Sequence, residues 1–391
     1  MSTSPTEFEP ERVHVLRSAD PEAQRAWLRR ALPALIRVRT KDVIVIKPNF
    51  CAPLPSQTGA TTSLWVLEET IRFVRDRRAK PVVVEAPSHI HPYEQVMDAT
   101  GAGRLMAELG VDHHDARVHT MELRPRRHED ATARVYQVAL SALGADGLIL
   151  LPKLKTHNRT LVTLGMKGLM GLLAVPDRHG FHLRGVTDDV VELTRRFAER
   201  IRGVVVDGVI AMEGHGPTQG RPLAMNVLAV GQDVVSVDSV CARMMGFEPE
   251  EIDHIRKAAE QGIGKMKREW QMHPAGVPLP LHYFERPRPD SGLRTKVITF
   301  PPLSAALRSI GYGTLGRTKP VVTEVPRCPT CTLCHDVCPT DAIRPPRLDY
   351  AKCVACGLCI PACPESAIQP EGRVQRLSRM ARELGQSLKT R

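Results

Sequence analysis

Aromatic side chains are scarce in this sequence of 391 residues, of which they make up 4%. Proteins that bind single-stranded nucleic acids stack the bases on aromatic rings that alternate with basic groups, and no such alternation occurs here. The formal net charge of +11 is therefore weak evidence for nucleic-acid binding. We predict that no nucleic acid is bound, and that the partners are anionic small molecules or acidic proteins.

Long apolar runs are absent as well. Uncharged apolar runs such as Gly147–Leu151 are far shorter than the ~20 residues that cross a membrane as a helix. The first residues, Met1–Pro10, are polar and acidic and lack the apolar segment of a secretory signal. We therefore expect a cytoplasmic protein without a membrane span.

Nucleotide-binding motifs are also missing. The sequence has no P-loop and no G-x-S-x-G elbow. A G-x-G-x-x-G string at Gly311–Gly316 lies among prolines and follows no clear strand, so we predict a loop there and no nicotinamide site. A flavin stays open as a further cofactor, since flavin sites lack a universal short motif, but no residue supports one.

Cysteines are the most informative residues present. Eight of the ten fall in two copies of C-x2-C-x2-C-x3-C-P, which are Cys328, Cys331, Cys334, Cys338 and Pro339, then Cys353, Cys356, Cys359, Cys363 and Pro364. Each iron of a [4Fe-4S] cluster needs one thiolate, and three cysteines spaced by two residues wrap a loop around three corners of the cluster. Zinc sites and disulfides explain this spacing less well, because neither uses the third cysteine or the proline. We predict two [4Fe-4S] clusters.

The two cysteine runs resemble those of bacterial two-cluster ferredoxins over residues 325–370. Residues 338–343 recur as residues 363–368, which indicates an internal duplication. The resemblance implies that the fourth cysteine of each run binds the other cluster. Cluster 1 would then have Cys328, Cys331, Cys334 and Cys363 as ligands, and cluster 2 would have Cys353, Cys356, Cys359 and Cys338. The isolated Cys51 and Cys241 are predicted to be packing residues, with a ligand or nucleophile as the alternative.

Upstream of the cysteines, short apolar runs alternate with helical patterns. Strands are predicted at residues 43–46, 81–84, 148–151 and 204–206, helices at 64–75, 93–108 and 190–200, and an antiparallel strand and a helix at 222–232 and 234–245. This alternation predicts an α/β fold with a largely parallel sheet flanked by helices. The predicted domains are an α/β domain (1–270), a proline-rich connector (271–325), a small α+β two-cluster ferredoxin-like domain (326–370) and a basic amphipathic helix (371–391).

Polar residues end the predicted strands of the α/β domain. Lys47 and Asn49 follow one apolar run, and Lys153, Lys155 and His157 follow another. Because ligands of α/β proteins bind beyond the carboxyl ends of parallel strands, these side chains predict a cationic pocket. Thr61 and Thr62 precede a helix and could hold an anion there. The alternative for each lysine is a solvated loop residue.

Two glycine-rich segments complete the candidate site. Glycines at 165, 168 and 171 flank Lys167 and would clear one face of a helix for a ligand or for a neighbouring helix. A glycine-rich loop is predicted at Asp207–Pro217 and would present Asp207, Glu213 and His215. The acid and the imidazole could donate protons during a reduction, or they could simply lie in an exposed turn.

These segments also resemble the domain-of-unknown-function family 362 over residues 40–265. The shared strings are Ile46–Asn49, Leu151–His157, Met166–Gly171, Val206–Pro217 and Gly231–Asp238. Members of that family are often fused to a bacterial ferredoxin module, so the resemblance implies an iron–sulfur protein and leaves its reaction open.

The sequence predicts an iron–sulfur reductase. An external donor (a ferredoxin, a flavodoxin or a reductase) would supply electrons, and the α/β domain would bind an anionic small molecule. The predicted catalytic residues are Lys153, Lys155, His157, Glu213 and His215; the predicted substrate-binding residues are Lys47, Asn49, Thr61, Thr62 and Lys167. The alternative is a non-catalytic electron relay or assembly factor that docks an acidic protein.

Iron and acid-labile sulfide assays test the two-cluster prediction. Anaerobically purified protein should contain about eight iron and eight sulfide ions per chain, because each cluster contributes four of each. About four of each would mean that only one cysteine run binds a cluster.

Overall fold

The computed structural model describes residues 7–88, 91–124, 134–175, 177–178, 181, 186–266 and 269–287. Beyond these it describes residues 319–322, 333–336, 338, 341–344, 347–349, 352–353, 359 and 368–371. The chain divides into two compact units near residue 290. The string Gly311–Gly316, the predicted terminal helix after residue 371, and Cys328, Cys331, Cys356 and Cys363 lie outside the described residues.

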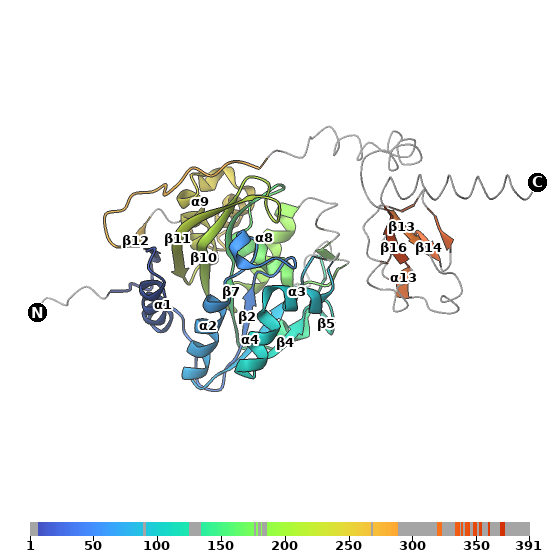
Figure 1. Cartoon of the computed structure of the whole chain (residues 1–391), viewed down its shortest axis with the longest axis horizontal. Coiled ribbons are helices and arrows are strands. Elements are labelled where there is room, and N and C mark those ends of the chain that lie inside the picture. Colours follow the sequence, from blue (N-terminus) through green and yellow to red (C-terminus); the bar gives the residue numbers. More distant parts are fainter. Residues whose placement is uncertain are drawn as a thin grey trace, which may run out of the picture. The chain divides into compact units, whose positions relative to one another are not determined.

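A mostly parallel sheet forms the middle of the first unit. Its strands are β1 (Val13–Arg17), β2 (Val43–Pro48), β3 (Lys80–Glu85), β4 (Asp112–Asp115), β7 (Gly147–Leu151), β10 (Ile201–Glu213), β11 (Arg221–Gly231) and β12 (Trp270–His273). They lie in the order β12-β1-β11-β10-β7-β2-β3-β4, and Figure 1 shows β11, β10, β7 and β2 side by side. β11 is antiparallel to β1 and β10, and the other neighbours are parallel. β8 (Lys153–His157) pairs with β10 and with β9 (Leu161–Val162).

Helices cover both faces of the sheet. They are α1 (Pro21–Leu35), α2 (Leu64–Asp76), α3 (Tyr93–Thr100), α4 (Ala102–Leu109), α5 (Leu140–Leu143), α6 (Leu164–Gly168), α8 (Val186–Phe197), α9 (Val234–Met244) and α10 (Asp253–Glu260). Short 3-10 turns are η1 (Ser56–Thr58), η2 (Leu169–Leu172) and η3 (Pro249–Glu251), and a hairpin joins β5 (Thr120–Leu123) to β6 (Tyr136–Ala139).

Alternation along the strands builds two cores. Ile44 and Ile46 face the core with α1 to α4, whereas Val45, between them, faces the core with α6, α8, α9 and α10. Successive strand residues point to opposite faces, so a run without polar residues, such as 43–46, can only be a strand buried on both sides. The predicted fold class, a largely parallel sheet flanked by helices, is confirmed.

The order of the strands creates a switch point between β2 and β7. From β2 the chain continues to β3 and β4 on one side, whereas from β7 it continues to β10 on the other side. Crossovers on the two sides of such a point leave a crevice beyond the carboxyl ends of the strands, where α/β proteins bind ligands. The residues that follow β2 and β7 therefore occupy the favoured place for a site.

The structure differs from the predicted elements in three places. The predicted helix at 93–108 is two helices, because Gly101 adopts a φ of +78° between them. The glycine-rich loop predicted from Asp207 is wrong as far as Glu213, because strand β10 continues through these residues and pairs with β11. The first residues of the predicted connector form β12, which pairs with β1. The domain boundaries themselves stay predictions.

The second unit has small described elements: β13 (Lys319–Val322) pairs with β16 (Ile368–Glu371), and β14 (Ile343–Arg344) with β15 (Arg347–Leu348), beside α13 (Leu333–Asp336). Within the described residues of both units, no helix is long and apolar enough to cross a membrane.

Candidate functional site

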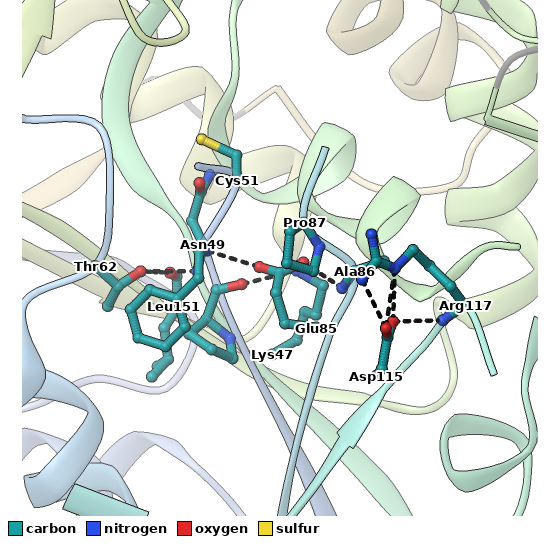
Figure 2. A network of polar contacts seen from close by, with 12 residues as sticks. Lys47, Asn49, Cys51, Thr62, Glu85, Ala86, Pro87, Asp115, Arg117 and Leu151 are labelled. Atoms are coloured by element: carbon teal, nitrogen blue, oxygen red, sulfur yellow. Dashed lines mark hydrogen bonds and ion pairs between the residues drawn. The ribbon is translucent and has the colours of Figure 1, made fainter. Parts of the chain in front are cut away.

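Lys47 and Glu85 form a buried ion pair at the carboxyl ends of β2 and β3. Lys47 Nζ lies 2.8 Å from Glu85 Oε1 and donates to the carbonyl of Pro48 at 2.7 Å. Burial lowers the pKa of Lys47, and Glu85 opposes that shift. Glu85 also accepts the backbone N–H of Phe50 and of Ala86, each at 2.8 Å (Figure 2). The pair therefore fixes the loop after β2.

Lys153 and Asp207 form a second pair, between β8 and β10. Both side chains are fully buried, and Lys153 Nζ donates to Asp207 Oδ2 at 2.7 Å. Asp207 also accepts the N–H of Ser63, in front of α2, and the N–H of Val209. Burial lowers the pKa of Lys153, and the attraction of Asp207 counters it. This pair ties three segments of the chain together below the site.

Lys155 lacks such a carboxylate. Its fully buried ammonium donates to the Asn49 side-chain oxygen at 3.2 Å, the Cys51 sulfur at 3.4 Å, and the carbonyls of Ala60 at 2.6 Å and Pro217 at 3.3 Å. All four acceptors are dipoles or a thiol. A buried charge that is solvated by neutral acceptors alone is costly unless an anion joins it.

Lys167 and Arg178 add two cations beside Lys155. In the part of the chain that the structure describes, Lys167 Nζ has no hydrogen-bond or ion-pair partner, and its side chain is half-buried. Burial, together with repulsion from Lys155 and Arg178, lowers the pKa of Lys167 to about 7. Arg178 donates to the carbonyls of Ala86 at 2.9 Å and Pro87 at 2.7 Å.

The charges around Lys155 therefore do not balance. Lys47 and Lys153 each have a carboxylate at 2.7–2.8 Å, whereas no carboxylate of the described residues lies within ion-pair distance of Lys155, Lys167 or Arg178. The region carries a surplus of positive charge in a place of low dielectric, where an anion is bound most strongly.

Glycines let the backbone close around this cluster. A Cβ atom on Gly171 would lie 2.5 Å from Lys47 Nζ and 2.4 Å from Glu85 Oε1, so any side chain there would have to displace the first ion pair. A Cβ atom on Gly216 would lie 2.0 Å from the carbonyl oxygen of Thr156, so the loop that supplies the Pro217 carbonyl needs glycine too. Gly165, in contrast, abuts Val234 and Asp238, so the glycines do not clear one common face.

The other predicted substrate-binding residues lie at the rim of the cluster. Asn49 donates its backbone N–H to Thr62 Oγ1 at 2.8 Å, and Thr62 donates to the carbonyl of Leu151 at 2.7 Å. Thr61 donates to the carbonyl of Leu54 at 2.8 Å. Both threonine hydroxyls thus donate to backbone carbonyls. The anion that accepts a backbone N–H at the start of α2 is the carboxylate of Asp207. Roles for Thr61 and Thr62 in ligand binding stay predictions.

The predicted proton donors are dispersed. His157 is buried, and its Nδ1 accepts the N–H of Arg159 at 3.1 Å. Glu213 is joined to Arg221 and accepts the N–H of Glu285 at 2.8 Å. His215 is exposed, two residues before Pro217. No contact joins Glu213 or His215 to the lysines, so their catalytic roles also stay predictions.

Sequence reasoning missed three residues of the cluster. Glu85 ends an apolar run as Lys47 does, and that shared pattern could have revealed it. Cys51 was predicted to be a packing residue, but it is half-buried and its sulfur contacts the Lys155 ammonium. Arg178 carries no sequence signal, because only the fold brings it to Glu85 and Lys167.

In the second unit, the described cysteines fit an iron–sulfur site. Cys334 and Cys359, which come from different runs, share a small core with Ile343 and Ile368. Cys338 Sγ accepts the N–H of Ala342 at 3.2 Å, a hydrogen bond of the kind that tunes cluster thiolates. Only four of the eight cysteines of the two runs are among the described residues. Within the described residues, no group of three metal ligands comes together.

Fold and cysteines together define an α/β iron–sulfur protein. A model of the 4Fe-4S binding domain matches residues 346–369, which include the second cysteine run, so one [4Fe-4S] site and a role in electron transfer are established. A model described as a domain of unknown function (DUF362) matches residues 44–243. The chain belongs to the DUF362 family, fused to a C-terminal 4Fe-4S domain.

Two similar proteins add context. Thylakoid-associated protein sll1697 of Synechocystis sp. is 26% identical over 235 residues, which cover 58% of this chain and 70% of that protein. The lactate racemase apoprotein from Thermoanaerobacterium thermosaccharolyticum has a TM-score of 0.35 and 13% identity. The match covers 66% of this chain and 58% of the racemase chain.

The two buried lysines of β8 should respond differently to substitution. Lys153→Met leaves the Asp207 carboxylate buried without a cation and should lower the free energy of unfolding by about 3–5 kcal/mol. Lys155→Met removes a charge that has no carboxylate and should cost less, about 1–2 kcal/mol, which reflects the buried carbonyls of Ala60 and Pro217 that lose a donor. Urea unfolding followed by tryptophan fluorescence measures both, since Trp27, Trp65 and Trp270 all lie in the first unit.

A double variant is the matched control. Adding Asp207→Asn to Lys153→Met should recover part of the loss, because the amide oxygen still accepts from Ser63 while no charge is buried. Equal losses for Lys153→Met and Lys155→Met would show that the proposed charge imbalance is wrong.

Proposed function

We propose that this chain is an iron–sulfur-dependent reductase whose α/β unit binds an anionic small molecule against Lys155, Lys167 and Arg178. The observation that carries the proposal is the buried amine of Lys155, which contacts an amide oxygen, two carbonyls and the Cys51 sulfur but no carboxylate. An anion beside it would supply the missing negative charge, so ligand binding would offset a desolvation cost that folding leaves uncompensated.

The same charges suit a reduction. Electrons that are added to a bound carboxylate or phosphate ester make it more negative, and fixed cations stabilise that extra charge more than they stabilise the starting anion. Lys47–Glu85 and Lys153–Asp207 are internally neutral, so their part is to hold Asn49, Ser63 and the strand ends in place. The positive charge that no carboxylate balances is carried by Lys155, Lys167 and Arg178.

The electron supply would come from the second unit. A bound [4Fe-4S] cluster carries one electron at a time, and two clusters, as the two cysteine runs predict, would match the two electrons of most organic reductions. The donor that reduces them would be an external ferredoxin, flavodoxin or reductase. The cluster ligands would include the four described cysteines. By the ferredoxin pattern, cluster 1 would bind Cys334, and cluster 2 would bind Cys338, Cys353 and Cys359.

An electron relay that docks an acidic protein is the second candidate, and the net charge of +11 favours it. Docking surfaces, however, need charges that a partner can reach. The Lys155 side chain is 0% exposed, so a small anion is the better match for this cluster.

Anaerobic reoxidation tests the reductase. Protein reduced with dithionite and freed of excess reductant should be reoxidised by one or more members of a panel of carboxylates and phosphate esters, followed by the return of the cluster absorbance. Lys155→Met should slow this reaction about 100-fold or more, the usual loss when one charge-stabilising donor is removed.

Lys80→Met is the control, because Lys80 is an exposed lysine paired with Asp112 away from the cluster. It should react like the wild type, and all variants should have the same absorbance before reduction. Reoxidation by a partner protein alone, with every small anion inert, would favour the relay.

A further inference from the structure

Lys167 differs from the other lysines of the cluster in having an unoccupied amine. The nitrogens of Lys47, Lys153 and Lys155 are bound by a carboxylate or by several protein oxygens. Lys167 Nζ has no such acceptor among the described residues, and the residue as a whole is half-buried. It is therefore the amine that a bound ligand can reach without displacing a protein contact.

The groups that face Lys167 from the surrounding elements are mostly cationic or neutral. Lys155 on β8, Arg159 after it, and Arg178 all disfavour its charge, and Cys51 is the neighbour that favours it. His254 on α10 is buried, and its pKa is lowered to about 3, so it is neutral at pH 7. The two carboxylate oxygens of Asp238, on α9, accept the N–H groups of Gly165 and Met166. These two residues lie at the start of the helix that carries Lys167.

From this arrangement we propose that Lys167 is the proton donor of the site, and that it takes up a proton when an anion binds beside Lys155. This inference rests on the proposed anion site and deepens it. An anion cancels the repulsion that Lys155 and Arg178 exert on the Lys167 ammonium, so the bound state favours its protonated form.

In a reduction that adds two electrons and two protons, Lys167 would give one proton to the reduced substrate. The electrons come from the external protein donor, and the N–H bond of the ammonium breaks as the new bond to the substrate forms. The second proton of the reduction comes from solvent, and the neutral amine that remains regains its own proton from solvent. A pKa of about 7 suits this cycle, because an acid works best when its pKa lies near the working pH.

Binding of oxalate to the full holoprotein tests the inference, because oxalate keeps both charges between pH 6 and 9. Calorimetric titrations in two buffers of different ionisation enthalpy report protons taken up on binding. At pH 7 the wild type should take up about half a proton per oxalate, since half of the free amines are neutral at a pH equal to the pKa. Between about pH 7 and 9 the association constant should fall by up to about tenfold per pH unit.

Lys167→Arg is the decisive variant, since a guanidinium keeps its charge throughout this range. It should bind oxalate without proton uptake and without the pH dependence, whereas Lys80→Met should match the wild type. Oxalate binding without proton uptake in the wild type, or equal uptake in Lys167→Arg, would refute the role of Lys167 and leave the anion site intact. Absence of binding by both oxalate and sulfate would refute the anion site itself, and this inference with it.

Discussion

The structure depends on how buried ammonium groups are compensated at one edge of a parallel sheet. Transfer of a lysine charge from water into a protein interior costs several kcal/mol, and a carboxylate in contact repays much of that cost. Lys47 and Lys153 are compensated in this way by Glu85 and Asp207. Lys155 has no such carboxylate. The cost of burying its charge is therefore not repaid in this way, which indicates a use other than packing. Anion binding is the simplest use for it.

Topology explains why the charges meet. β2, β3, β7 and β10 are parallel, so residues far apart in sequence finish their strands at the same edge, and the switch between β2 and β7 opens that edge. The two ion pairs then act as braces: one holds the loop after β2, and the other joins β8, β10 and the start of α2. Glycine at 171 allows η2 to come within contact of the first ion pair, and glycine at 216 allows its loop to come within contact of Thr156 on β8.

Much of this could be read from the sequence, and the limits have physical causes. Apolar, β-branched runs such as 43–46 and 148–151 have no stable place except a sheet buried on both faces, so the α/β class and the strand ends with Lys47, Lys153 and Lys155 were predictable. The cysteine spacing likewise pointed to iron–sulfur chemistry. Pairing, in contrast, depends on distances between segments. Sequence alone could not tell that Lys153 meets Asp207 while Lys155 meets no carboxylate, nor that Arg178 joins the cluster from a separate segment. Within the described residues, Glu213 at the end of β10 and His215 just after it make no contact with the lysines.

The most direct test of the central claim is a crystal structure of the full chain grown or soaked in selenate and measured at the selenium absorption edge. The account predicts an anomalous peak within contact of the amines of Lys155 and Lys167. Selenium peaks confined to surface arginines and lysines, with none at Lys155, would contradict it.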